Sequence, residues 1–367
     1  MLPAVRLGPS ASALLLAALT ASITGCGGSG GPSPSPVPSP ETYHATVDVF
    51  YDQDGNGVRD SDEPGVVPNV QVEIGGKSGV SQSHTGRVEL DGLVAGVQPV
   101  LLKTLPPFYQ AGTPVSMAIP QAAGVESSVP AILPIGNNVP GLYMAFGDSI
   151  TDGDGSDDDQ GYRGMLASKL QAHFNQGLIN NQAIGGTRSK NGKNRIDDSL
   201  GSVKPAYVLI LYGTNDWNDN QCRENFPCFT IDSLRSMIRS AKAHHTLPVI
   251  STIIPCNTGY DARTPPERNL WIADMNDLIR PMAREEGAVL VDMYAAFMAV
   301  PDFHTLFFDH VHPNEAGYVI MAQKWFEGIS QPAASATSET TAPPKPRAPR
   351  PLHSYGAPGW EIGPNEE

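Results

Sequence analysis

Hydrophobic residues change their spacing along this chain near residue 140, and the change separates two kinds of structure. Over residues 43–138 they recur at alternate positions, as in the run Val47, Val49 and Tyr51. Alternate spacing puts successive side chains on opposite faces of a strand, and the Gly and Pro residues between such runs are typical of turns. We therefore expect a small all-β sandwich here.

After residue 140, short apolar runs alternate with segments that have helical spacing, such as residues 162–174, where Tyr162, Leu166 and Leu170 share one face. Continuously apolar strands separated by amphipathic helices indicate a parallel sheet covered on both faces. We expect a three-layer α/β/α domain over residues 140–330, with its ligand site at the carboxyl ends of the strands. The expected strands are 142–146, 179–184, 207–212, 249–254 and 288–293.

The first residues have the pattern of a secretory leader: Arg6 precedes an apolar stretch from Ala11 to Leu19 that is too short to span a membrane. The sequence Ile-Thr-Gly-Cys that ends at Cys26 resembles the lipobox of bacterial lipoproteins. That resemblance implies a signal peptide over residues 1–25, a lipid on Cys26, and a location in the bacterial cell envelope, facing the periplasm or the exterior. The alternative is an ordinary leader followed by an odd cysteine.

Two further segments lack the pattern of a packed domain. Residues 26–42 contain GGSGGPSPSPVPSP and predict an extended linker, able to hold a domain roughly 40 Å from a membrane at about 3.1 Å per residue. Residues 331–367 are polar and rich in Pro, and we expect a disordered tail.

Composition and charge exclude one class of partner. The 367 residues include 24 Lys and Arg against 38 Asp and Glu, a formal net charge of -14 at pH 7. Contacts with phosphate require Lys and Arg, so this balance argues against nucleic acid. The 37 Gly and 34 Pro fit a chain with linkers and turn-rich β structure. We expect a monomer.

Three cysteines follow Cys26, in a compartment where disulfides form. Cys222 and Cys228 flank a short polar loop and could pair, but Cys256 could equally take one of them, and the sequence leaves both pairings open. No histidine lies at ligand spacing from these cysteines, so we do not expect a zinc site.

The stretch DQDGNGVRDSDE over residues 52–63 places oxygen-bearing residues at the positions of a calcium loop, with Gly57 at the sharp turn. A strand pattern precedes it and Pro64 disfavours a helix after it, so the loop resembles the calcium-binding B-type repeats of bacterial surface adhesins rather than a helix-loop-helix. The resemblance implies a structural Ca²⁺. The alternative is a solvated acidic turn. The implied ligands are the side chains of Asp52, Asp54, Asn56, Asp60 and Glu63 and the carbonyl oxygen of Val58.

Ser149 follows an apolar run in LYMAFGDSITD, without the G-x-S-x-G pattern of α/β-hydrolases. The Gly-Asp-Ser run resembles the first block of the GDSL or SGNH hydrolases. Three further blocks of that family follow in order: AIGGTRS at 183–189, LYGTND at 211–216 and FFDHVHPNEAGY at 307–318. The resemblance covers residues 142–328 and implies a flavodoxin-like fold with a five-stranded parallel sheet.

The chemistry of an acyl transfer asks for these residue types. A serine hydroxyl needs a base to take its proton, and a neutral imidazole suits neutral pH. His312 would be that base for Ser149, and Asp309 would hold its imidazole in the correct tautomer. The family implies that the oxyanion meets the backbone N–H groups of Ser149 and Gly186, or less expectedly Gly185, and the side-chain amide of Asn215.

Other polar and aromatic residues near these blocks have simpler explanations. His310 is expected to be a surface or packing residue, and Asp292 a loop or cap residue. Trp217 and Trp271 could form a sugar-stacking wall but are expected to be packed. The acidic loop 152–159 lacks regular ligand spacing and is expected to be a solvated rim, with a second metal site as the alternative.

The sequence thus predicts a membrane-tethered serine hydrolase that cleaves carboxylic esters, with no metal in the chemical step. The tether, spacer and polar rim favour short acyl esters, acetyl above all, on carbohydrate. One alternative is a lysophospholipase or lipid esterase of the same family. The other is a surface adhesion module that has lost its activity.

Overall fold

The structure of the protein is a computed structural model that describes residues 39–332. The predicted signal peptide 1–25, the lipidation residue Cys26, most of the linker 26–42 and residues 333–367 lie outside the described part. Within residues 39–332, none of the helices combines the length and the hydropathy needed to cross a membrane.

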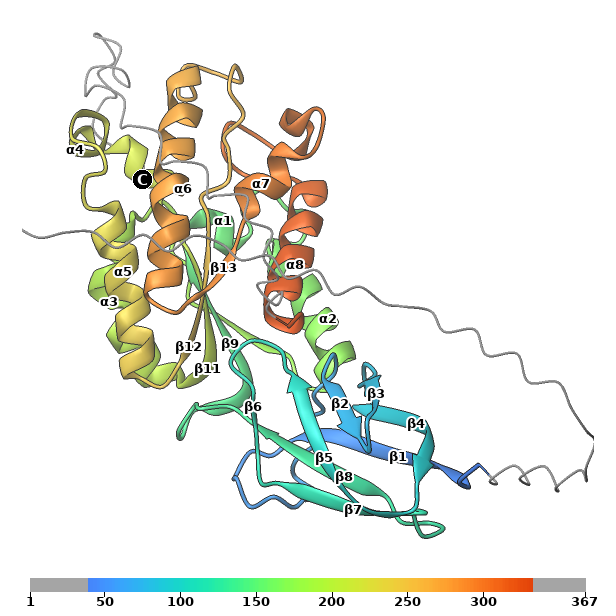
Figure 1. Ribbon diagram of the computed structural model, residues 1–367. Helices are drawn as coiled ribbons and strands as arrows, with labels where there is room; N and C mark the ends of the chain where they lie inside the picture. Colours follow the sequence, from blue (N-terminus) through green and yellow to red (C-terminus); the bar gives the residue numbers. More distant parts are fainter. Residues whose placement is uncertain (1–38, 333–367) are drawn as a thin grey trace, which may run out of the picture. The chain divides into compact units, whose positions relative to one another are not determined.

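The first part of the described chain is an all-β domain made of two four-stranded sheets (Figure 1). One sheet has the order β4-β1-β8-β6 and the other has the order β3-β2-β5-β7. The first contains β1 (Thr42–Tyr51), β4 (Arg87–Val94), β6 (Gln110–Ala111) and β8 (Ser127–Ile132). The second contains β2 (Gln71–Ile74), β3 (Lys77–Val80), β5 (Gly96–Thr104) and β7 (Val115–Ile119).

Alternating residues of both sheets fill the space between them. Val47 and Val49 on β1 and Val72 and Ile74 on β2 are buried in one hydrophobic cluster, as their alternate spacing predicts. The structure therefore confirms the all-β domain that the sequence predicts before the α/β domain.

The second part is built on a five-stranded parallel sheet with the order β10-β9-β11-β12-β13. In chain order this is 2-1-3-4-5, the arrangement of flavodoxin-like folds, and it confirms the predicted fold class. The central strand β11 is buried along its whole length, as expected for a sheet covered on both faces. The strands are β9 (Val139–Gly147), β10 (Leu178–Asn181), β11 (Pro205–Leu211), β12 (Leu247–Ser251) and β13 (Val289–Val291).

Helices cover the two faces of this sheet (Figure 1). On one face α2 and α8 pack with alternate strand residues such as Leu209, and on the other α3, α5 and α6 pack with the intervening residues such as Val208. The long helices are α2 (Tyr162–Phe174), α3 (Ser189–Val203), α5 (Thr230–Ala243), α6 (Pro266–Glu285) and α8 (Glu315–Ser330). The short ones are α1 (Ser149–Asp152), η1 (Thr214–Asn218), α4 (Asn220–Glu224), α7 (Met293–Met298) and η2 (Phe303–Leu306).

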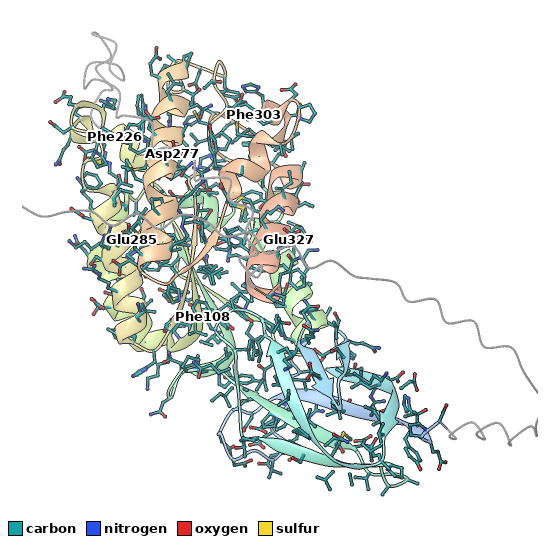
Figure 2. The ribbon with its side chains drawn as sticks, in the orientation of Figure 1. Phe108, Phe226, Asp277, Glu285, Phe303 and Glu327 are labelled. Carbon is teal, nitrogen blue, oxygen red and sulfur yellow. A yellow bond between two sulfur atoms is a disulfide. The ribbon has the colours of Figure 1, made fainter. Side chains whose placement is uncertain are left out.

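The β domain and the α/β domain share one hydrophobic cluster. Phe108, labelled in Figure 2, meets Tyr207 near the start of β11, and the Tyr109 ring stacks on Phe174 at the end of α2. These contacts lie at the amino ends of the strands, whereas Ser149 follows the carboxyl end of β9. The β domain thus supports the sheet from the side away from the serine.

Candidate active site

The turn after β9 presents Ser149. Gly147 ends the strand, and a Cβ there would overlap the Leu211 carbonyl oxygen on the neighbouring strand. Asp148 caps α1, and its carboxylate accepts a hydrogen bond from the Ile150 N–H at 3.1 Å. Ser149 is the first residue of α1, buried except for 8% of its surface, at the edge of the sheet where ligand sites are expected.

A chain of hydrogen bonds joins the three residues that the sequence singled out. Ser149 Oγ lies 2.8 Å from His312 Nε2, and His312 Nδ1 lies 2.8 Å from Asp309 Oδ2. Asp309 Oδ1 accepts hydrogen bonds from the N–H groups of Val311 and His312, both at 2.8 Å. One oxygen of the Asp309 carboxylate is therefore held by the backbone of its own loop, while the other contacts the imidazole.

The charges around this chain favour an ionised acid and a basic imidazole. Burial opposes ionisation of Asp309, but its contacts with His310, with His312 and with two backbone N–H groups outweigh burial and hold the pKa of Asp309 well below its usual value. Burial also opposes protonation of His312. The Asp309 hydrogen bond and the negative charges of Asp309, Asp154 and Asp148 nevertheless raise the pKa of His312 above its usual value.

Asp148 has a different role from Asp309 despite its position beside the serine. It is 1% exposed, and burial raises its pKa to about 7. Its Oδ2 accepts a hydrogen bond from Asn215 Nδ2 at 3.4 Å. Asp148 therefore links the turn of the serine to the turn that carries Asn215.

Besides Ser149 itself, the residues predicted to stabilise an oxyanion come from two turns at the carboxyl edge of the sheet. Asn215 lies in η1, and its Nδ2 also donates to the Thr187 carbonyl oxygen at 3.2 Å. A Cβ on Gly185 would lie 3.7 Å from the Ser149 Cβ, whereas a Cβ on Gly186, where φ is +69°, would meet nothing within 4 Å. The structure brings both turns close to the serine, and the roles of the individual donors stay predictions.

The acidic loop is more ordered than a solvated rim. The Arg163 guanidinium donates to the carbonyl oxygens of Asp152 and Asp159, at 2.7 Å and 2.9 Å, and the Tyr318 hydroxyl donates to the Asp154 carbonyl oxygen at 2.7 Å. The Asp154 carboxylate lies 3.8 Å from His312 Nε2. Asp154 of this loop thus belongs to the site. The sequence did not predict this, because His312 and Tyr318 lie more than 150 residues farther along the chain.

The rival residues have structural roles. Trp217 and Trp271 are 4% and 0% exposed and pack edge to face, so they form no sugar-stacking wall. Asp292 caps α7 through the Ala295 N–H at 3.1 Å and pairs with Arg280 at 2.7 Å. Within the described residues, none of these three side chains has a hydrogen bond to Ser149, whose hydroxyl bonds to His312.

The structure shows which of the three cysteines pair, a question that the sequence left open. Cys222 and Cys228 form a disulfide, and Cys256 is a buried free thiol. The bridge closes a six-residue separation beside η1, and the Trp271 Nε1 donates to the Cys222 carbonyl oxygen at 3.1 Å.

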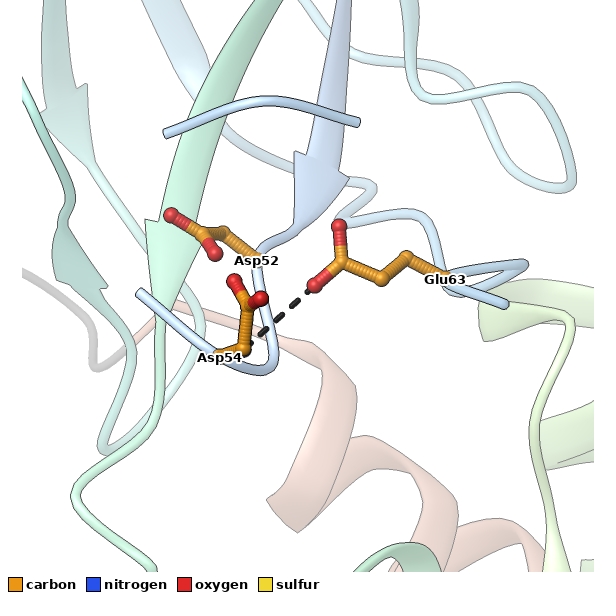
Figure 3. Close-up of side chains that lie close together, drawn as sticks. All are labelled: Asp52, Asp54 and Glu63. Atoms are coloured by element: carbon orange, nitrogen blue, oxygen red, sulfur yellow. Dashed lines mark hydrogen bonds between the residues drawn. The ribbon is translucent and has the colours of Figure 1, made fainter. Parts of the chain in front are cut away.

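In the β domain, Asp52, Asp54 and Glu63 offer carboxylate oxygens that all lie within 4.8 Å of one another (Figure 3). Asn56 Nδ2 donates to Asp54 and to Asp60, each at 2.9 Å, so these side chains gather in the same loop. Three carboxylates so close repel one another unless a cation lies between them, and short oxygen ligands at this spacing suit Ca²⁺. The predicted Val58 ligand is a backbone carbonyl, and the Val58 side chain is exposed.

Comparisons with known proteins bear on the α/β domain. Residues 145–320 match the GDSL-like Lipase/Acylhydrolase family, a span that includes every residue of the predicted triad and oxyanion site. The acetylxylan esterase of Geobacillus stearothermophilus is 28% identical over 211 residues, 51% of this chain and 92% of that protein. The uncharacterised protein YpmR of Bacillus subtilis (strain 168) is 25% identical over 211 residues, 52% of this chain and 82% of that protein. A solved structure of a catalytic mutant of Axe2, the acetylxylan esterase from Geobacillus stearothermophilus, has a TM-score of 0.44 and 22% identity, and the match covers 52% of this chain and 95% of that one.

Proposed function

The α/β domain of this chain belongs to the GDSL-like lipase/acylhydrolase family and is an ester-hydrolysing enzyme, and from this premise we propose that it removes short acyl groups, acetyl above all, from carbohydrate. The observation that carries the proposal is the hydrogen-bonded chain from Ser149 through His312 to Asp309, with both links at 2.8 Å.

In the proposed reaction, Ser149 Oγ attacks the ester carbonyl carbon while His312 Nε2 takes the hydroxyl proton. Asp309 holds the Nδ1–H and stabilises the imidazolium that forms. When the tetrahedral intermediate collapses, the C–O bond to the alcohol breaks and the alcohol oxygen takes the proton from Nε2. A water molecule then attacks the acyl-enzyme with the same imidazole as its base, which releases the acid and restores Ser149.

The negative charge that develops on the carbonyl oxygen needs donors that are already in place. We assign these to the N–H groups of Ser149 and Gly186 and to Asn215 Nδ2. Asn215 Nδ2 now donates to Thr187 and Asp148, so it would exchange one of these partners for the oxyanion. When the partner exchanged is the neutral Thr187 carbonyl oxygen, the new acceptor is charged and the hydrogen bond becomes stronger in the transition state.

The choice of a short acyl group on carbohydrate is supported by two observations. The acetylxylan esterase of Geobacillus stearothermophilus is similar to 51% of this chain. The loop beside His312 carries five aspartates between residues 152 and 159, and so gives the site a polar rim that suits a substrate rich in hydroxyl groups better than a lipid.

The test compares wild type with Ser149→Ala on the 4-nitrophenyl esters of acetate, butyrate and octanoate, and on acetylated xylan. We expect wild type to release acetate from both kinds of substrate, to prefer acetate to octanoate, and to lose nearly all activity in Ser149→Ala. Ser168→Ala, an exposed serine on α2, is the matched control and should behave as wild type. Equal rates for wild type and Ser149→Ala would refute the serine mechanism, and a preference for octanoate would favour the lipid esterase.

We also propose that the loop over residues 52–63 holds one structural Ca²⁺. The convergence of Asp52, Asp54 and Glu63 supports this, since a cation would relieve their repulsion. Glu63 now accepts the N–H groups of Gln53 and Asp60, which orients its carboxylate inwards. Calorimetry of the full chain should show binding near 10⁻⁴–10⁻³ M, roughly the range of extracellular modules, and Asp52→Asn should abolish it. Binding by the variant equal to that of wild type would remove the loop as the site.

For the cell, we propose a lipid anchor on Cys26 that tethers the enzyme to the bacterial envelope. The motif lies outside the described residues, so the support is its sequence alone. In a bacterial host, Cys26→Ser should move the protein from the membrane fraction to the soluble extracytoplasmic fraction. An unchanged distribution would contradict the anchor.

A further inference from the structure

The acidic loop and the loop of His312 meet at Gly155. A Cβ at this position would lie 2.6 Å from the Pro313 carbonyl oxygen, 3.0 Å from the Phe308 Cβ and 3.2 Å from the His312 Cβ. Gly155 also has φ +90°, in the region that favours glycine. The contact therefore requires a residue without a side chain, and it holds the two loops together beside the imidazole.

Asp154 lies on the leaving-group side of the proposed reaction. Its backbone is held at both ends, because its N–H donates to the Ser149 carbonyl oxygen at 3.1 Å and its own carbonyl accepts from the Tyr318 hydroxyl at 2.7 Å. Its carboxylate lies 3.8 Å from His312 Nε2, and the side chain is 54% exposed. Since Nε2 gives its proton to the departing alcohol, the carboxylate flanks the place where that alcohol must lie.

Phe308 provides an apolar surface at the same junction. Its N–H donates to the His312 carbonyl oxygen at 2.9 Å, so the backbone turns tightly around the catalytic loop. Its side chain is 66% exposed, whereas the neighbouring Phe307 is buried in the core. The Phe308 Cβ lies against Gly155, the residue that follows Asp154, and an exposed aromatic side chain on the same junction as a carboxylate suits a ligand with one apolar face and a rim of hydroxyl groups.

We propose that Asp154 and Phe308 form a subsite for the alcohol part of the substrate, selecting a pyranose ring that carries the acyl ester next to a free hydroxyl. In this subsite the C–H face of the sugar lies against Phe308, and the neighbouring hydroxyl donates a hydrogen bond to the Asp154 carboxylate. The inference rests on the proposed function and sharpens it, because it names the sugar ring and the free hydroxyl that the site would recognise within the carbohydrate. The negative charge of Asp154 also disfavours an alcohol that carries a carboxylate or phosphate.

The test uses the full chain and two acetate esters that differ only in their alcohol: 4-nitrophenyl acetate, which has no hydroxyl, and methyl 2-O-acetyl-β-D-xylopyranoside. Asp154→Asn and Phe308→Ala should each lose about tenfold more kcat/KM on the xyloside than on 4-nitrophenyl acetate, the size of one hydrogen bond to a charged group or one aromatic contact. The loss on the xyloside should appear mainly in KM.

Two variants serve as matched controls. Asp157→Asn makes the same charge change in the same loop, at an exposed side chain that does not contact His312. Leu178→Ala removes an exposed apolar side chain at the start of β10, where Leu178 pairs with Leu142 of β9, roughly 17 Å from the end of that strand at Gly147 by strand rise. Both should keep the wild-type ratio between the two substrates.

A second measurement does not depend on turnover of the sugar ester. Methyl β-D-xylopyranoside should inhibit wild-type hydrolysis of 4-nitrophenyl acetate competitively, with an inhibition constant about tenfold higher in Asp154→Asn. Equal losses on both esters, an unchanged substrate ratio, or inhibition that is the same in both proteins would overturn the subsite.

The failures of the two proposals can be told apart. Activity of wild type on 4-nitrophenyl acetate with none on the acetylated xyloside refutes the sugar subsite and leaves the esterase intact. No activity on either ester refutes the proposed function, and the subsite with it. If Phe308→Ala changes the particle mass in solution and leaves the substrate ratio unchanged, Phe308 belongs to a contact between copies of the chain, and the subsite is refuted.

Discussion

His173 on α2 offers a direct test of how the two domains are held together. Its ring lies between them: Nδ1 is 2.7 Å from Ser83 Oγ, Nε2 is 3.4 Å from Asn69 Nδ2, and the ring packs edge on against Phe174 and Phe326. The side chain is 8% exposed, and burial lowers its pKa from 6.5 to about 4. The folded protein therefore holds this imidazole in its neutral form.

The magnitude follows from the difference between the two pKa values. At His173 the unfolded chain binds a proton more tightly than the folded one. The contribution of the neutral imidazole to the free energy of unfolding is therefore fully present above pH 6.5 and is lost as the pH falls towards 4. The full difference corresponds to about 3 kcal/mol of unfolding free energy, of which about 2 kcal/mol is lost by pH 5.

The perturbation is His173→Gln, whose amide can still bond to Ser83 and Asn69 but does not titrate. Urea unfolding followed by tryptophan fluorescence, in EDTA and at several pH values between 7 and 5, gives the unfolding free energy of each protein. We expect wild type to lose about 2 kcal/mol more than the variant over this range. His44→Gln, at a histidine with 52% side-chain exposure, is the control and should follow wild type. Parallel pH dependence of wild type and His173→Gln would refute the reasoning.

Three further predictions concern the site. Asn215→Ala should lower kcat by about 10²–10³ with the fold unchanged, because one oxyanion donor is lost; a variant within threefold of wild type in steady-state assays would remove Asn215 from the mechanism. Activity should fall on the acid side as His312 takes up a proton, and Asp154→Asn should move this limb to lower pH, because the Asp154 charge raises the pKa of His312; an unmoved limb in a pH–rate profile would contradict this. Burial raises the pKa of Asp148 from 3.8 to about 7, so its ionisation destabilises the fold as the pH rises through this range. Asp148→Asn should therefore be more stable than wild type at pH 8, by up to about 4 kcal/mol, and not at pH 4, as measured by denaturant unfolding; a variant that is less stable at pH 8 would contradict the raised pKa.

The sequence was most informative where the chemistry depends on short spacings. Asp309 and His312 are three residues apart, so one tight loop suffices to join them, and the 2.8 Å hydrogen bond between them is local. The calcium loop is similar, since twelve consecutive residues contain all its predicted ligands. The burial of Val47 and Val49 on one face of β1 likewise follows from the alternation of side chains along a strand.

Tertiary structure decided the features that depend on distant contacts. The structure pairs Cys222 with Cys228 and leaves Cys256 as a buried thiol, whereas the sequence had left Cys256 as an equal partner. Asp154 looked like one acid among several. The structure distinguishes Asp154 from its neighbours, because its carboxylate lies 3.8 Å from His312 Nε2 and the next residue, Gly155, contacts the loop of His312 more than 150 residues farther along.

The sequence by itself therefore determined the class of fold and predicted the nucleophile, base and acid, because fold class follows from the spacing within single elements and the prediction follows from residue type and the order of the four blocks. The structure decided the strand order, the shared core of the two domains, and the ionisation of Asp148 and His173. Those properties depend on which surfaces are removed from water when segments far apart in the chain pack together, and burial of that kind has no local signature in a sequence.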